Sequence, residues 1–147
     1  MIKATYVIRN MFFDSGKVLK AVHRARRAAL SKAGAFVRRR ARSSIRRRKR
    51  ASRPGQPPTN RSGLLRDWIL FGYDHAADTV FVGPVRLQKR GNAPEVLEHG
   101  GRTIFEGYRR GRWVKRRIRI APRPFMGPAM EAEAKNFPDL WKNSVKP

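Results

Sequence analysis

The histidines and acidic residues are the side chains with which this chain could perform catalysis or bind a metal. The sequence holds three histidines, ten Asp and Glu residues and no cysteine among its 147 residues. Glu95 and His99 are four residues apart and would share one face of a helix, as metal ligands do. One carboxylate and one imidazole do not complete a metal site, however, and no second His or Cys cluster is present. A capping or surface role is favoured for both, and we predict no metal site.

The arrangements typical of enzymes are missing from the sequence. There is no nucleophile elbow with a matching Ser-His-Asp order and no glycine-rich loop that would hold phosphates. The ten acidic residues are scattered singly, which disfavours a paired-carboxylate hydrolase. We therefore expect no catalytic residue, no cofactor and no enzymatic activity.

Positive charge is the most extreme property of the chain, which carries a formal net charge of +25. Residues 15–66 contain eighteen Lys or Arg and no acid, and residues 102–123 contain nine with Glu106 as the one acid. Such a field attracts nucleic acid, an anionic membrane surface or an acidic protein, and it opposes self-association. The densest run, RRRARSSIRRRKR, is predicted to contact a polyanion or a protein partner through Arg38, Arg39, Arg40, Arg42, Arg46, Arg47, Arg48, Lys49 and Arg50.

Two classes of partner can be weighed from the sequence. The longest uninterrupted apolar run is WILF, which is far too short to span a bilayer, so no membrane partner is expected. Phosphate contacts from so many cations favour nucleic-acid binding without sequence preference. No zinc-finger spacing, ribonucleoprotein aromatic signature or KH loop is present to recognise bases.

The basic run belongs to a long predicted helix. Residues 1–13 alternate in polarity and predict a strand or arm, and Asp14 or Ser15 can cap a helix over residues 14–48. Gly34 in its middle weakens the prediction slightly. Apolar residues recur along this segment at three- and four-residue steps, which predicts one narrow buried stripe: Val18, Val22, Ala25, Ala29, Ala33, Phe36 or Val37, Ala41 and Ile45.

The rest of the chain predicts a sheet and a second helix. Residues 49–63 are rich in proline and glycine and predict a flexible loop. Residues 64–122 predict the sheet, with strands over 65–71, 79–82, 103–108 and 112–120 and a helical turn over 94–99. Residues 123–147 predict a C-terminal helix that Pro138 interrupts. The expected fold is α+β in a single domain, residues 1–147: a long basic N-terminal helix, an antiparallel sheet of four or five strands and a C-terminal helix.

Four short motifs follow one another after the basic run. They are RSGLLRDWI (61–69), VFVGP (80–84), APEVLEHGG (93–101) and RPFMGPAMEAE (123–133). Their order and spacing resemble the head–tail joining, or tail-completion, proteins of tailed bacteriophages of the lambdoid type. The resemblance covers residues 36–144 and carries the family's motif positions to Gly63, Leu64, Arg66, Leu97, Glu98, Gly100, Arg123, Pro124, Phe125, Pro128 and Ala129.

The resemblance implies a structural virion protein without catalytic activity. Such a protein forms a ring, expected to have six copies, in the neck between the capsid connector and the tail. It would be assembled in the host cytoplasm, with adjacent connector and tail-tube proteins as partners and packaged DNA as a further candidate contact. Two features depart from the family: its members do not generally carry so extreme a charge, and residues 1–35 match none of its motifs.

The motif residues have a structural and a functional interpretation. Glycine and proline at these positions are typical of fold determinants, with Phe125 as an apolar anchor for the last helix. Glu98 is the exception, because a single acid among so many arginines is expected to pair with Arg123 or with an arginine of a neighbouring subunit. Three functions remain open: the phage neck ring, a free-standing nucleic-acid-binding protein, and a minor virion protein such as a capsid decoration subunit.

Overall fold

A computed structural model describes residues 14–85 and 92–145 of the chain. Its fold class is α+β, as predicted, with a long N-terminal helix, antiparallel strands and a helical C-terminal region. The strand expected in residues 1–13 lies outside the described residues. The elements in chain order are α1 (Ser15–Ser44), α2 (Leu64–Asp67), β1 (Ile69–Asp74), β2 (Thr79–Pro84), α3 (Ala93–His99), β3 (Gly101–Arg109), β4 (Arg112–Ile120), α4 (Met126–Ala134) and α5 (Phe137–Trp141).

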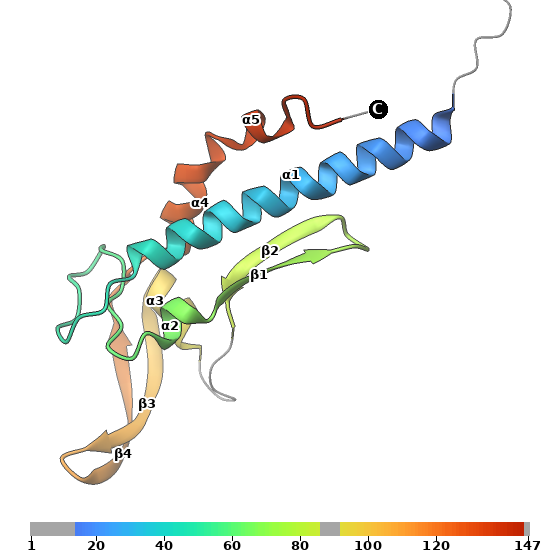
Figure 1. Cartoon of the computed structure of the whole chain (residues 1–147). Helices are drawn as coiled ribbons and strands as arrows, with labels where there is room; N and C mark the ends of the chain where they lie inside the picture. The colour runs from blue at the N-terminus through green and yellow to red at the C-terminus, as the bar shows by residue number, and fades with distance from the viewer. Residues whose placement is uncertain (1–13, 86–91, 146–147) are drawn as a thin grey trace, which may run out of the picture.

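Helix α1 forms the long axis of the molecule (Figure 1). Asp14 caps it, as predicted, because its side chain accepts a hydrogen bond from the Lys17 backbone N–H at 3.0 Å. The β1–β2 hairpin lies along one side of α1, and α4 and α5 contact it on another side (Figure 1). The helix therefore connects two structures that do not follow one another in the sequence.

Helix α1 ends at Ser44, four residues before the predicted end at residue 48. Ile45 has an extended backbone, with φ −82° and ψ 111°, and is only 1% exposed. The hydroxyls of Ser43 and Ser44 donate to the carbonyls of Arg40 and Ala41, and such side-chain bonds compete with continuation of a helix. The charged residues after Ile45 thus belong to the following loop.

The predicted apolar stripe is buried only along the part of α1 that other elements cover. Ala25, Ala29, Val37 and Ala41 are buried, and Ile45 follows directly after the helix. Val18 and Val22, near the N-terminal end, are 42% and 41% exposed, so their predicted burial is wrong for the isolated chain. The periodicity identified the correct face of the helix but not how far that face is covered.

The strands pair as two separate antiparallel hairpins, whereas one sheet of four or five strands was expected. In the first hairpin β1 pairs with β2, and Phe71 lies opposite Val82. The first strand begins at Ile69 and not at Leu65, because Gly63 has a φ of +86° and starts the single helical turn α2. This turn directs Leu65 into the core.

The second hairpin, β3–β4, extends away from the rest of the molecule (Figure 1). Tyr108 lies opposite Trp113 beside its turn, and their rings meet edge to face at 5.2 Å between centroids. Along β4 the predicted alternation holds, with Val114, Ile118 and Ile120 less exposed than their neighbours.

The core lies where the C-terminal end of α1 meets α2, β1 and α4. Phe125, Ile45 and Ile69 are its largest fully buried side chains, each at most 1% exposed. The C-terminal helical region begins at Met126 and divides into α4 and α5, with Pro138 near the start of α5. Seven buried residues form one cluster: Val37, Ala41, Ile45, Leu65, Ile69, Phe125 and Ala129.

Gly34 is a point of close approach between α1 and the β1–β2 hairpin. A Cβ atom there would lie 2.4 Å from Cγ1 of Val80 and 3.3 Å from the Phe71 ring. We predict that Gly34→Ala lowers the free energy of unfolding by about 1 kcal/mol, because overpacking costs more than the gain in helix propensity. Urea unfolding checks this, with exposed Gly16→Ala as the control that should not destabilise. A stabilised Gly34→Ala variant would contradict the close contact.

Candidate assembly and polyanion-binding surfaces

The nine basic residues predicted to contact a partner fall into two groups. Five of them use their side chains within the chain: Arg38, Arg39, Arg40, Arg42 and Arg47. The other four are exposed and make no ion pair with any described residue: Arg46, Arg48, Lys49 and Arg50. The second group is the one that the structure leaves open to a partner.

Arg38 and Arg39 illustrate the internal group. The Nε–H of Arg38 donates to the Ile69 carbonyl at 2.8 Å and so attaches α1 to the start of β1. The Arg39 guanidinium lies over the Phe36 ring, 5.0 Å from its centroid, in a cation–π contact. Arg38 therefore joins two elements, whereas Arg39 makes its contact within α1 itself.

Arg40 forms the link between α1 and α4. Its guanidinium donates to the buried carboxylate of Glu133, which also accepts from the Asn136 side-chain amide at 3.3 Å. The hydrogen bond from Arg40 is the main cause that lowers the pKa of Glu133 below its usual range, although burial acts in the opposite direction. Glu133 is the one buried charged side chain among the described residues, and it is paired.

This pair predicts a dependence of stability on acid pH. A carboxyl whose pKa is lowered by folding stabilises the protein above its unfolded pKa, and that contribution is lost as the pH falls through the folded pKa. Wild type should therefore exceed Glu133→Gln in stability at neutral pH, with a difference that narrows below about pH 4.5. Thermal unfolding of both proteins across the acid range measures this, and a difference independent of pH would refute the assignment.

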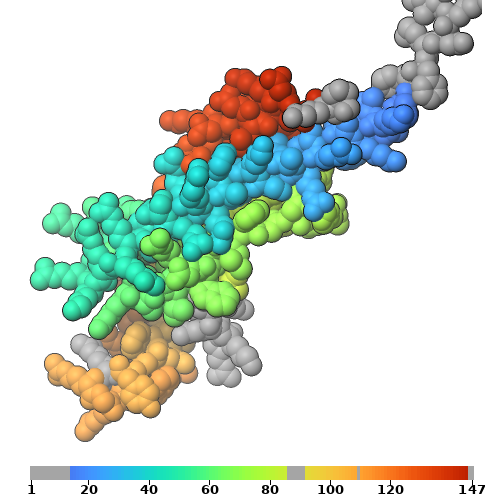
Figure 2. All heavy atoms as spheres, viewed as in Figure 1, coloured from blue at the N-terminus to red at the C-terminus, as the bar shows by residue number. Residues whose placement is uncertain are grey.

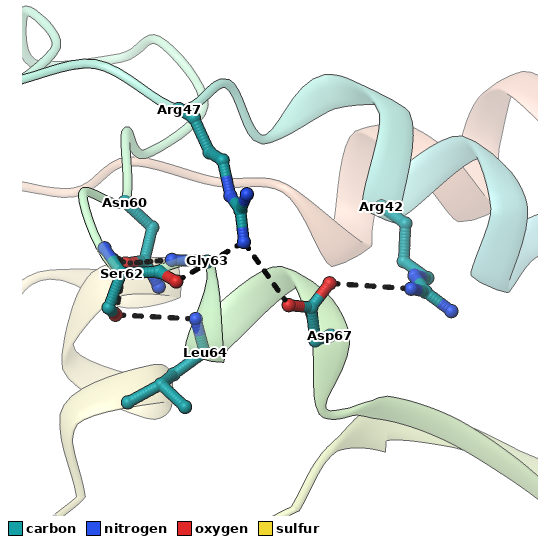
Figure 3. Close-up of polar contacts among 7 residues, drawn as sticks. All are labelled: Arg42, Arg47, Asn60, Ser62, Gly63, Leu64 and Asp67. Carbon is teal, nitrogen blue, oxygen red and sulfur yellow. Dashed lines mark hydrogen bonds and ion pairs between the residues drawn. The ribbon is translucent and has the colours of Figure 1, made fainter.

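Asp67 on α2 pairs with two arginines, one on α1 and one in the segment that follows it (Figure 3). Its carboxylate lies 3.5 Å from a guanidinium nitrogen of Arg42 and 3.7 Å from one of Arg47. Arg47 also donates to the Ser62 carbonyl at 3.3 Å. Asp67 is half exposed, so these pairs orient α2 against the end of α1 more than they stabilise the fold.

The predicted flexible loop, residues 49–63, is held by specific hydrogen bonds. The Asn60 side-chain oxygen accepts from the backbone N–H groups of Ser62 and Gly63, each at 3.0 Å (Figure 3). The backbone N–H of Asn60 donates to the Arg46 carbonyl, and the Thr59 hydroxyl donates to the Arg50 carbonyl. The loop thus folds back along the residues that follow α1.

Glu98 is placed differently from its predicted pairing with Arg123. Its carboxylate accepts hydrogen bonds from three successive backbone N–H groups, those of Phe125 at 2.8 Å, Met126 at 3.0 Å and Gly127 at 2.7 Å. These are the amides that the first turn of α4 leaves without partners, so Glu98 caps that helix from 27 or more residues away. The expected ion pair with Arg123 is wrong, and the alternative pairing with an arginine of a neighbouring subunit stays a prediction.

Arg123 instead joins the chain segments that meet beside the cap. Its Nε–H donates to the Ser52 carbonyl at 3.1 Å, and its backbone N–H donates to the Leu97 carbonyl at 2.6 Å. Gly100 ends α3 with a φ of +77°, and a Cβ atom there would lie 2.9 Å from Cδ of Pro122. Close approach of two chain segments therefore explains this glycine.

The structure brings most of the motif residues together. Phe125 and Leu97 pack on or in the core, Glu98 caps α4, and Pro128 occupies its first turn, where a missing N–H breaks no helical bond. Pro124, which precedes Phe125, is half-buried. Leu64 and Arg66 have exposed side chains on α2 and are not among the residues of the core cluster.

An exposed apolar surface was not predicted from the sequence. In the β3–β4 hairpin Ile104, Tyr108 and Trp113 are 53%, 75% and 60% exposed. Two aromatic residues flanking the predicted turn RRGR were the signal that could have indicated it. Figure 2 shows this hairpin and the long side chains after α1 projecting from the same end of the molecule.

Within residues 14–85 and 92–145 no three His, Asp or Glu side chains gather as metal ligands. None of the described helices has the length and hydropathy needed to cross a membrane. Comparison with protein families, with curated proteins and with solved structures found no match to this chain.

Proposed function

We propose that this chain is a structural subunit of an oligomeric ring in the neck of a tailed bacteriophage, where it joins the capsid connector to the tail. Six copies, adjacent connector and tail-tube proteins as partners, and assembly in the host cytoplasm belong to the same proposal. The observation that carries it is the exposed apolar surface of the projecting β3–β4 hairpin. The order of the four sequence motifs supplies the identity of the ring.

The β3–β4 hairpin supports the assembly proposal because few contacts within the chain stabilise the hairpin. A two-stranded hairpin alone is marginally stable in water, and α3 is the element that packs on β3. Glu106 and Lys115 form an ion pair across it at 2.9 Å, but this pair is solvent-exposed and contributes little. Contact with a neighbouring protein would cover Ile104, Tyr108 and Trp113 and fix the hairpin.

A second exposed apolar surface lies on the N-terminal part of α1, the end of that helix that Figure 1 shows far from the β3–β4 hairpin. Val18, Leu19 and Val22 form it. Two different apolar surfaces at two ends favour head-to-tail contacts between copies, and such contacts close into rings when the rotation permits. We therefore assign the two surfaces to the two sides of one subunit interface.

The charge of the chain requires partners for such a ring. Each copy carries +25, and screening at physiological salt, with a Debye length of about 8 Å, leaves repulsion across close contacts. Acidic surfaces of the connector or the tail tube, or packaged DNA, would offset it.

Binding of nucleic acid without sequence preference, through the arginine-rich segment, is the second candidate function. One observation favours it: Arg46, Arg48, Lys49 and Arg50 are exposed and make no ion pair with any residue that the structure describes.

The double variant Tyr108→Ser, Trp113→Ser tests the hairpin's role in assembly. Sedimentation velocity should show a multimer in wild type that this variant loses, because its tip no longer offers apolar surface. Trp141→Ser removes a tryptophan of comparable exposure, 45%, from α5 and serves as the matched control. A multimer that survives in the hairpin variant would count against the proposed interface.

A further inference from the structure

A pocket of about 620 Å³ lies between the end of α1 and the loop that folds back along it. Arg46, Arg48, Arg50 and Arg53 line it, together with Ser52 and Gln56, and no acidic residue does. None of the four arginines makes an ion pair with a described residue. The pocket therefore concentrates cationic donors that the fold itself does not use.

The early end of α1 is what arranges these arginines. Ile45 has an extended backbone and Arg46 forms a β-bridge with Thr59, so successive side chains at this point turn to opposite sides. Arg46, Arg48 and Arg50 line the pocket, whereas Arg47 between them turns towards Asp67. Had the helix continued to residue 48, these residues would have been distributed around its circumference.

The loop is fixed in place around the pocket by backbone contacts on both sides. Asn60 N–H donates to the Arg46 carbonyl at 3.0 Å, and Gly55 N–H donates to the Pro122 carbonyl at 2.8 Å. The Arg123 side chain holds the Ser52 carbonyl at 3.1 Å. A binding site assembled in this way loses little conformational entropy when a ligand enters.

Three of the four hydroxyl groups that line the pocket have hydrogen-bond partners, and the fourth has none among the described residues. Those of Ser43, Ser44 and Thr59 donate to backbone carbonyls, two of them to the last turn of α1, where they offset part of its negative end. Oγ of Ser52 is buried and makes no hydrogen bond with a described residue. A buried hydroxyl without a partner is costly, and because Ser52 lines the pocket, rotation of its side chain would let the hydroxyl donate to an acceptor oxygen of a ligand.

We propose that this pocket binds phosphate groups. Guanidinium groups match phosphate oxygens in two-pronged geometry, and Ser52 adds a neutral donor. The volume exceeds that of one phosphate and leaves room for the sugar to which it is attached. Phosphate of this kind occurs in a nucleic-acid backbone and in free nucleotides, and the site recognises the chemistry that both share. The inference does not depend on the neck-ring function.

Binding of two probes to the full chain tests the proposal. Fluorescence anisotropy of a short labelled duplex, and calorimetry with inorganic pyrophosphate, are measured at one fixed ionic strength for each variant. Arg48→Gln, Arg50→Gln removes two pocket charges, and Arg110→Gln, Arg112→Gln removes two from the β3–β4 turn as the matched control. Ser52→Ala removes the neutral donor alone. Thermal unfolding checks that every variant is folded.

The pocket variant should bind at least one probe about tenfold more weakly, whereas the control should change by less than about twofold. Ser52→Ala should weaken the same probe at unchanged charge. Displacement of the duplex by pyrophosphate would identify free phosphate as a ligand. Duplex binding without displacement would identify the nucleic-acid backbone as the ligand. Equal losses in the two double variants, or no binding of either probe by wild type, would overturn the proposal.

Discussion

Phe125→Ala is expected to lower the free energy of unfolding by about 3–5 kcal/mol, the largest effect of any single change considered for this chain. Phe125 is 1% exposed and lies in the cluster that joins α1, α2, β1 and α4. Natural domains are stable by about 5–15 kcal/mol, so the variant should retain only a small part of the wild-type stability. Chemical denaturation followed by tryptophan fluorescence gives the value.

Phe81→Ala provides the control for this prediction. Phe81 is also an aromatic residue, but it is 64% exposed, so its removal should change the stability of the monomer by less than about 0.5 kcal/mol. Phe125→Leu, which keeps most of the volume, should cost clearly less than the alanine variant. Similar losses for Phe125→Ala and Phe81→Ala would show that the core is not centred on Phe125.

Glu98→Ala should have the second-largest effect, a loss of about 2 kcal/mol. The substitution removes the partner of three backbone N–H groups and a negative charge at the N-terminal end of α4. Glu98→Gln retains an acceptor oxygen but not the charge, so an intermediate loss is expected. Thermal unfolding and hydrogen exchange of the α4 amides measure both variants.

Glu95→Ala is the matched control, because it removes an exposed carboxylate from the same short helix without touching α4. Its stability should stay close to that of wild type. Glu98→Ala with wild-type stability and unchanged exchange of the Met126 and Gly127 amides would contradict the capping role.

Local patterns in the sequence predicted the elements well. Period-3.6 spacing of Ala25, Ala29 and Ala41 identified the buried face of α1, and Asp14 was one of the two residues predicted to cap it. Alternation in residues 112–120 identified β4. Each of these signals depends on neighbours a few residues away. The end of α1 was missed because burial of Ile45, together with the hydroxyl bonds of Ser43 and Ser44, outweighs the helix propensity of the residues that follow.

The roles of individual charged residues could not be predicted in the same way. Glu133 meets Arg40 across 93 residues, and Glu98 meets the start of α4 across 27 to 29. The scarcity of acidic residues marked Glu98 as a residue with a role. It predicted a guanidinium group as the partner of Glu98, whereas the fold supplies backbone N–H groups. Nothing local distinguishes Arg47, which faces Asp67, from Arg48, which faces the pocket.

The proposed ring is tested most directly by the native mass of the purified chain. We would record it by native mass spectrometry across a salt series, with and without short duplex DNA. The account predicts a single multimer, expected to have six copies, that forms without DNA and becomes more abundant as salt screens the repulsion between subunits. A monomer at every salt concentration, which binds duplex DNA of any sequence and releases it as salt rises, would contradict the account and favour nucleic-acid binding.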